Sequence, residues 1–152
     1  MFTFACSSQF FELMRKSLLP FLLFIFLMTP GCKKDIFHFP YAPISLDLGI
    51  LSELGQLGPD EVFFKDGYGV GGLIIYRDTE NNYYVYDRAC TYEKDFSCKV
   101  NKDSSFNQVM ECSCCKSRYL LGETADPIKG PSTYPLVQYN AFIDGDLLRI
   151  KN

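Results

Sequence analysis

Two short segments hold most of the cysteines of this chain, and cysteine is the residue type here with the widest choice of chemistry. The first segment, residues 88–98, reads RACTYEKDFSC, and the second, residues 111–119, reads ECSCCKSRY. Cysteine thiolates bind zinc and iron–sulfur clusters. In exported proteins the same side chains pair as disulfides that stabilise small domains. The two segments therefore predict either the two halves of one metal site or a disulfide framework.

The N-terminal part of the chain has the pattern of an export signal. Arg15 and Lys16 precede the apolar run LLPFLLFIFLM at residues 18–28. This run is shorter than the roughly 20 apolar residues that a membrane span needs, and it has the length of a signal-peptide core. Gly31 then stands directly before Cys32 in TPGC, which is the ending of a bacterial lipoprotein signal, where the cysteine is acylated. An ordinary signal peptide cut nearby is the alternative.

The lipoprotein pattern divides the chain into three parts. Residues 1–31 are predicted to contain the signal peptide, and Met14 is the predicted start of translation. Residues 32–43 are predicted to be a lipidated N-terminus and tether. Residues 44–152 have the size of one domain. We therefore expect a cell-envelope protein that a lipid on Cys32 holds on a membrane, in an oxidising compartment.

The number of cysteines in the predicted domain leaves one thiol over. These cysteines are odd in number, so they cannot all pair within one chain. At least one of them must be free, bound to a metal, or paired with another molecule. The cysteines after Cys32 are Cys90, Cys98, Cys112, Cys114 and Cys115.

Charge and histidine content exclude several classes of function. The chain has 15 Lys and Arg against 18 Asp and Glu, a formal net charge of −3, and no basic patch that would bind nucleic acid. Its single histidine, His38, lies in the N-terminal arm, far along the chain from both cysteine segments. No Ser-His-Asp or Cys-His catalytic pair can be built from it. We therefore expect no catalytic residues.

Short β-forming runs separated by turn signals make up the predicted domain. An Asp-Gly pair at Asp144 and Gly145 between two such runs predicts a C-terminal hairpin. The glycines of residues 67–72 lack the lysine of a phosphate loop, and we interpret them as a close backbone approach or a bulge. Residues 50–57 could form one or two helical turns. With no long amphipathic helix, the pattern predicts an all-β, antiparallel sandwich or barrel. The predicted strands include residues 44–48, 61–64 and 83–87.

The cysteine segments resemble the two loops of Rieske domains. In that family a Cys-x-His loop and a Cys-x-x-His loop bind a [2Fe–2S] cluster, and in the form found in cytochrome bc complexes each loop has a further cysteine. Cys90 and Tyr92 stand at the first pair of ligand positions, and Cys112 and Cys115 at the second. The resemblance implies an all-β fold with a small two-loop cluster-binding subdomain.

Further residues extend the resemblance over about residues 44–152. Ser117 and Tyr119 follow the second segment as the small residue and the aromatic of the family do. Residues 130–132, Gly-Pro-Ser, look like the proline loop that covers the cluster. In cytochrome bc proteins the extra cysteines form a disulfide between the loops, and here Cys98 and Cys114 fall near their positions.

The ligand set departs from the family at both histidines. Tyr92 stands where the first histidine belongs and Cys115 where the second belongs. A Rieske centre needs two histidines, and His38 is the only one in the chain. One chain therefore cannot build the standard centre.

Three arrangements of the cysteines remain open from the sequence. With a Cys98–Cys114 disulfide, the other three thiols and the Tyr92 phenol could hold a [2Fe–2S] cluster, with Cys90, Cys112 and Cys115 as its metal ligands. Without that disulfide, Cys98 could supply a fourth thiolate to a cluster or to zinc. In the third, no metal binds. The loops are then stapled by Cys98–Cys114 or by Cys90–Cys112, and Tyr92 packs into the space of the lost cluster.

These arrangements correspond to two functions. The first is a membrane-anchored module for electron transfer or iron–sulfur and metal binding, with a redox protein as its partner. The second is a cluster-free, disulfide-stapled lipoprotein that acts as a structural or interaction module. Neither is an enzyme by itself, because a Rieske oxygenase carries a separate catalytic iron domain and this chain is too short for one. At most the chain is the electron-transfer component of a partner oxidoreductase.

Overall fold

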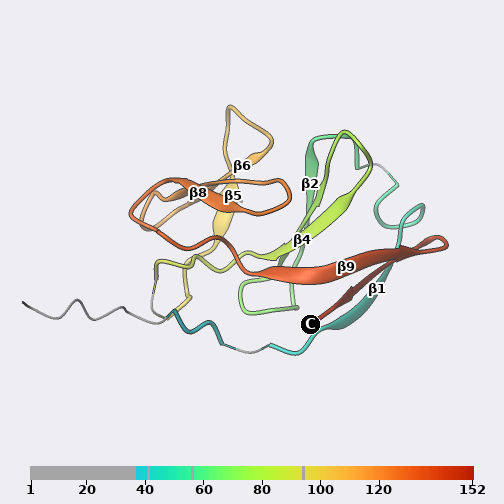
Figure 1. The fold of residues 1–152 in the computed structure, drawn as a ribbon, viewed down its shortest axis with the longest axis horizontal. Coiled ribbons are helices and arrows are strands. Elements are labelled where there is room, and N and C mark those ends of the chain that lie inside the picture. Colours follow the sequence, from blue (N-terminus) through green and yellow to red (C-terminus); the bar gives the residue numbers. More distant parts are fainter. Residues whose placement is uncertain (1–36, 41, 56, 94) are drawn as a thin grey trace, which may run out of the picture. The chain divides into compact units, whose positions relative to one another are not determined.

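Ten strands, all paired antiparallel, form two sheets in the part of the chain that the structure describes (Figure 1). The computed structural model describes residues 37–152 except 41, 56 and 94, so the predicted signal peptide and Cys32 lie outside it. The larger sheet has the order β1-β10-β9-β4-β3-β2 and the smaller sheet β5-β6-β7-β8. The strands are β1 Ser45–Gly49, β2 Glu61–Lys65, β3 Leu73–Arg77, β4 Tyr83–Asp87, β5 Val100–Lys102, β6 Val109–Cys112, β7 Arg118–Leu120, β8 Asp126–Lys129, β9 Gln138–Asp144 and β10 Leu147–Lys151.

Strands β3 and β4 separate two apolar clusters, because successive side chains of a strand point to opposite faces of the sheet. Ile74 and Tyr86 are fully buried on the face that packs with the smaller sheet. Ile75 and Val85 are fully buried on the other face, among residues of β1 and β10. This burial on both faces explains the continuous apolar run of β3. The loop that follows β4 therefore starts from strands that are packed on both faces.

Polar contacts fix the smaller sheet on the larger one. The carboxylate of Asp60, next to β2, accepts hydrogen bonds from the hydroxyl of Tyr76 at 2.8 Å and from the amide of Gln108 at 2.7 Å. The hydroxyl of Tyr86 donates to the carbonyl of Gly122, beyond β7. The bonds of Asp60 with Gln108 and of Tyr86 with Gly122 join segments of the two sheets and so hold their relative position.

The all-β prediction is confirmed, with local differences in the predicted elements. The strand predicted at residues 83–87 agrees with β4, and that at residues 44–48 is shifted by one residue from β1. The C-terminal hairpin is present, but Asp144 pairs with Leu147, so its turn is Gly145–Asp146 and not the Asp-Gly pair. Residues 50–54 form turns, with no helix. Within the described ranges, no helix has the length and apolar character needed to cross a membrane.

An aromatic contact fixes the start of the described chain. The ring of Phe37 stacks on that of Tyr134, with centroids 4.6 Å apart, and the ring of Phe39 meets that of Phe96 edge-on at 4.9 Å. Phe96 belongs to the loop between β4 and β5, and Tyr134 to the segment before β9. Through Phe37 and Phe39, the N-terminal arm therefore packs against the loops at the cysteine end of the domain.

Replacing Phe37 by alanine should loosen this arm without unfolding the strands. Losing the stacked pair removes about 1 kcal/mol of aromatic contact in addition to the buried area. Amide hydrogen exchange of residues 37–43 should then accelerate about tenfold, while that of β3 and β4 stays unchanged. Phe142→Ala is the matched control, because that ring is 47% exposed in β9. Equal exchange of the arm in both variants would contradict the assigned contact.

Candidate metal centre

The loop that carries Cys90 is positioned by a buried carboxylate at the end of β4. Asp87 is fully buried, and its oxygens accept hydrogen bonds from the amides of Val70, Gly71 and Ala89 at 2.6, 2.8 and 2.8 Å. The hydroxyl of Tyr139 donates a fourth at 2.7 Å. The carboxylate thereby fixes the backbone one residue before Cys90, at the start of loop 1 (residues 88–99).

The glycine-rich segment lies against the same backbone. A side chain at Gly71 would place its first carbon 2.4 Å from the amide nitrogen of Ala89, so only glycine fits there. The carbonyl of Gly72 accepts from the amide of Arg88 at 2.9 Å, and the backbone of Gly72 has a φ of +98°, which favours glycine. The interpretation of residues 67–72 as a close backbone approach is confirmed.

The second loop is a tight turn between β6 and β7. Loop 2 comprises residues 113–117 and follows Cys112, the last residue of β6. The amide of Cys112 donates to the carbonyl of Ser117 at 2.9 Å, and the amide of Lys116 donates back to the carbonyl of Cys112 at 3.1 Å. Lys116 has a φ of +62°, which turns the chain within this short loop. As a result Cys115 projects back toward the end of β6.

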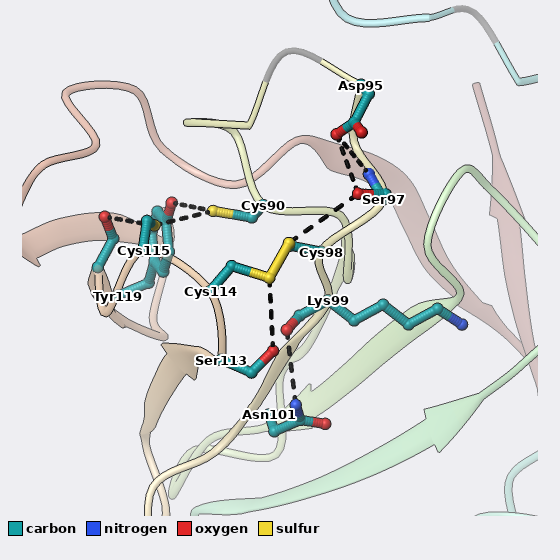
Figure 2. The surroundings of a disulfide bond; sticks show 11 residues. Cys90, Asp95, Ser97, Cys98, Lys99, Asn101, Ser113, Cys114, Cys115 and Tyr119 are labelled. Carbon is teal, nitrogen blue, oxygen red and sulfur yellow. Dashed lines mark hydrogen bonds between the residues drawn. A yellow bond between two sulfur atoms is a disulfide. The ribbon is translucent and has the colours of Figure 1, made fainter.

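A disulfide between Cys98 and Cys114 joins the two loops, as Figure 2 shows, with a Cα–Cα distance of 6.1 Å. The pairing that the family resemblance implied is therefore confirmed. Two alternatives are wrong for this structure. Cys98 is not available as a fourth thiolate, and Cys90 and Cys112 are both free, so they do not form a disulfide with each other.

Removing this disulfide should lower the free energy of unfolding by about 3 kcal/mol, the loop-closure value for a link of this length. The two cysteines are 16 residues apart. The double variant Cys98→Ala/Cys114→Ala should show the lower value in urea denaturation. The unreduced wild type is the reference, and dithiothreitol should bring it to the value of the variant. Equal stability of variant and unreduced wild type would show that the link is not formed in solution.

The three remaining cysteines converge into one group. Cys90 and Cys112 are fully buried and Cys115 is partly exposed. Their sulfur atoms all lie within 4.8 Å of one another, and those of Cys90 and Cys115 are 3.5 Å apart. The structure therefore brings together the three thiols that the sequence analysis singled out, from the end of β4, the end of β6 and loop 2. We call them the three-thiol group.

Hydroxyl groups surround the three-thiol group. The hydroxyl of Tyr119 lies 3.5 Å from the sulfur of Cys90, and that of Ser117 lies 3.1 Å from the sulfur of Cys115. The amide of Ser132 donates to the oxygen of Ser117 at 2.8 Å, and the thiol of Cys115 donates to the same oxygen. Once Cys115 is ionised, the Ser117 hydroxyl can turn and donate to its thiolate, and the Tyr119 hydroxyl can do the same for Cys90.

A second layer of hydrogen bonds ties the predicted proline loop to loop 1. The hydroxyl of Thr91 donates to the carbonyl of Tyr134 at 2.9 Å and lies 3.0 Å from the hydroxyl of Ser132 and 3.2 Å from that of Tyr119. Thr91, Ser132 and Ser117 are all buried. The sequence analysis did not select Thr91 and Ser132 as site residues. Their positions in the sequence could have identified them, because Thr91 follows Cys90 and Ser132 lies in the Gly-Pro-Ser segment.

The environment shifts the pKa values of Cys90 and Cys115 in opposite directions. Burial raises the pKa of the Cys90 thiol to about 12. Burial also works to raise the pKa of Cys115, but hydrogen bonds from Ser117 and from the neighbouring thiols more than offset it, so that pKa lies below its ordinary value. Burial and the neighbouring Cys90 raise the pKa of the Tyr119 hydroxyl, which therefore stays a hydrogen-bond donor. Cys115 therefore ionises before Cys90.

Tyr92 and His38 lie differently from the three thiols. The side chain of Tyr92 is 50% exposed, so the packed position that the cluster-free alternative gives it is wrong. Its backbone amide, by contrast, donates a hydrogen bond to the sulfur of Cys90. His38 is exposed in the arm and is not a member of the three-thiol group.

Comparisons with solved structures identify the architecture. The domain is similar to a cyanobacterial plasma membrane Rieske protein from Synechocystis PCC 6803, with 18% identity and a TM-score of 0.54 over 70% of this chain and 99% of the other. The domain has the Rieske fold. A second similar chain comes from the complex of reduced oxygenase and oxidized ferredoxin in carbazole 1,9a-dioxygenase, with 18% identity and a TM-score of 0.50 over 69% of this chain and 99% of the other. No protein-family model and no curated protein matches the sequence.

The Rieske fold accounts for the position of the three-thiol group. The two loops project from adjacent strand ends, β4 and β6, and the disulfide holds them together. The fold therefore keeps a Rieske-type scaffold, in which Cys115 adds a third thiol to Cys90 and Cys112.

Proposed function

We propose that this Rieske domain is an electron-transfer module that binds a metal or iron–sulfur group through the three-thiol group. The convergence of three free thiols within 4.8 Å, in loops already joined by a separate disulfide, is the observation that supports this. A framework needed only for stability would use its cysteines in pairs. The hydroxyl donor beside Cys115 lowers the pKa of this thiol, which favours its thiolate form.

The donor chemistry fits a thiolate-bound [2Fe–2S] cluster with one ligand still to be supplied. Cys90, Cys112 and Cys115 would hold it, and Tyr92 is the candidate for the fourth position. Such a cluster supplies one-electron transfer. Because anionic ligands replace neutral imidazoles, its potential should approach about −400 mV, well below most Rieske centres. The chain's own residues would position the ligands and donate hydrogen bonds to the sulfurs, chiefly from Ser117, Tyr119 and the Tyr92 amide.

The proposed partner is a redox protein, and the proposed location is the cell envelope. The complex that contains the similar carbazole dioxygenase chain joins a ferredoxin to an oxygenase, and the similar cyanobacterial protein is a plasma membrane protein. Both support a carrier that passes electrons to a partner protein. Membrane attachment through lipid on Cys32 completes the proposal, on the strength of the export pattern in the sequence.

One distance favours a second candidate, a single zinc ion. Two thiolates bound to one tetrahedral ion by bonds of about 2.3 Å lie about 3.8 Å apart. The sulfurs of Cys90 and Cys115 are 3.5 Å apart, close to this value. This spacing would suit one ion held by both thiolates, with Cys112 as a third ligand.

Metal and sulfide analysis tests these candidates. The chain should be purified anaerobically from the cytoplasm and, separately, after natural export. Two irons and two acid-labile sulfides per chain, with visible absorption, are the expected result for the cluster. One zinc without sulfide would establish the second candidate. Metal in neither preparation would overturn the proposal and leave the disulfide-stapled interaction module, with binding partners as the next question.

A further inference from the structure

We propose that Cys90 and Cys115 are a redox-active pair that, in the metal-free protein, closes a second disulfide between the loops by exchange with an external disulfide. Their sulfurs are 3.5 Å apart, in contact, and neither belongs to the disulfide of Cys98 and Cys114. A disulfide needs sulfurs about 2.05 Å apart. Closing the pair therefore requires a movement of about 1.5 Å, within the reach of side-chain rotation in an exposed loop.

The existing disulfide lies beside the proposed pair. The amide of Cys90 donates to the carbonyl of Cys98 at 2.8 Å, so these two residues are neighbours across loop 1. Cys114 and Cys115 are neighbours in sequence in loop 2. The proposed pair thus runs from loop 1 to loop 2 next to the existing link, between the same two backbone segments (Figure 2).

An external disulfide can reach the Cys90–Cys115 pair more easily than it can reach Cys112. Cys115 is partly exposed, and Cys114 beside it is exposed, so an external disulfide can reach loop 2. Cys112 is fully buried at the end of β6. Closing Cys90 with Cys115 leaves Cys112 as the single unpaired thiol among the five cysteines of the domain, which accounts for their odd number.

The exchange balances in atoms and electrons. The sulfur of Cys115 attacks one sulfur of an external disulfide, forms a mixed disulfide, and releases one external thiol. The sulfur of Cys90 then attacks that of Cys115 and releases the second external thiol. Two electrons pass from the pair to the external disulfide, and the two thiol protons end on the two released thiols. The substrates are small or protein-borne disulfides, with the reverse reaction run by dithiols.

Closure and metal binding exclude each other, because the link consumes two thiols of the three-thiol group. This coupling rests on the proposed function, whereas the exchange itself does not. An oxidised chain would have to be reduced before it could take up metal.

Labelling of Cys90 tests the proposal in the full-length chain. Metal-free protein is treated with glutathione disulfide, alkylated and digested with trypsin, which isolates Cys90 in the peptide of residues 89–94. In wild type and in Cys112→Ser, alkylation of Cys90 should fall about tenfold or more and return with dithiothreitol. In Cys115→Ser, it should stay complete. The linked peptides of Cys98 and Cys114 report that each variant has folded, and the wild-type result needs no variant.

Three results would overturn the proposal. They are full alkylation of Cys90 in wild type, a glutathione adduct on Cys90, and protection of Cys90 in Cys115→Ser, which would mean pairing with Cys112.

Zinc added before glutathione disulfide separates this proposal from the proposed function. Protection of the pair from oxidation by zinc would support the metal site. Closure at the same rate with and without zinc would support the pair and contradict the zinc candidate.

Discussion

Replacing Cys112 by serine is expected to reduce the metal content of the purified protein to background. Cys112 is the fully buried member of the three-thiol group on a strand, where no other residue can move into its place. A serine hydroxyl is a much poorer ligand for a soft metal than a thiolate. Two thiols would remain, and the affinity should fall more than about 100-fold, beyond the loss seen for residues that only support a ligand. Iron, zinc and sulfide per chain are the measurement.

The matched control is the double variant Cys98→Ser/Cys114→Ser. It removes two cysteines from the same loops and leaves the three-thiol group intact. This variant should keep at least part of its metal, at lower stability. Unchanged metal content in Cys112→Ser would show that the ligand assignment is wrong. Equal loss in both proteins would indicate that the loop structure, and not the thiol of Cys112, governs binding.

Replacing Asp87 by alanine should destabilise the domain by about 3–5 kcal/mol, because the four donors that its carboxylate satisfies would lose their acceptor inside the fold. Tyr139→Phe removes one of these donors and should cost about 1 kcal/mol. Urea denaturation of the two variants and wild type is the measurement. If Asp87→Ala is too unstable to purify, Asp87→Asn is measured in its place. Its loss of stability should exceed that of Tyr139→Phe.

Asp144→Ala is the control for a carboxylate at the surface. Asp144 pairs with Arg149 at 2.9 Å, but its side chain is 56% exposed, so its loss should cost less than about 1 kcal/mol. If Asp87→Ala and Asp144→Ala lost similar stability, water would be replacing the carboxylate of Asp87. The start of loop 1 would then depend on other contacts.

The features that the sequence predicted correctly are local or belong to a recurrent loop pattern. Alternating and continuous apolar runs predicted the strands. A strand buried on one face needs an apolar residue at every second position, and a strand buried on both faces needs them throughout. The spacing of the cysteine segments, read through the Rieske resemblance, predicted the link of Cys98 with Cys114 and the convergence of the other three thiols. Both follow from short segments that carry their own signal.

The features that the sequence did not predict depend on partners that are distant in sequence. Asp87 meets Tyr139 across 52 residues, and Thr91 meets Ser132 across 41. A lone polar residue at the end of a strand gives no periodic signal of such a contact. The packing of Phe37 on Tyr134 was missed for the same reason, since the sequence suggested only an extended tether. Residues 50–57 had apolar spacing that suited a helical turn, but Gly49 and Gly55 flank a stretch too short to propagate one.

The packing of the N-terminal arm also limits how a second protein can dock. Phe37 and Phe39 occupy surface beside Phe96 and Tyr134 that a Rieske partner would otherwise be able to touch. The exposed residues of the two loops beside the sulfurs include Tyr92, Ser113, Cys114 and Lys116. A second protein that reaches this end of the domain therefore meets these residues, while Phe96 and Tyr134 are already in contact with the arm.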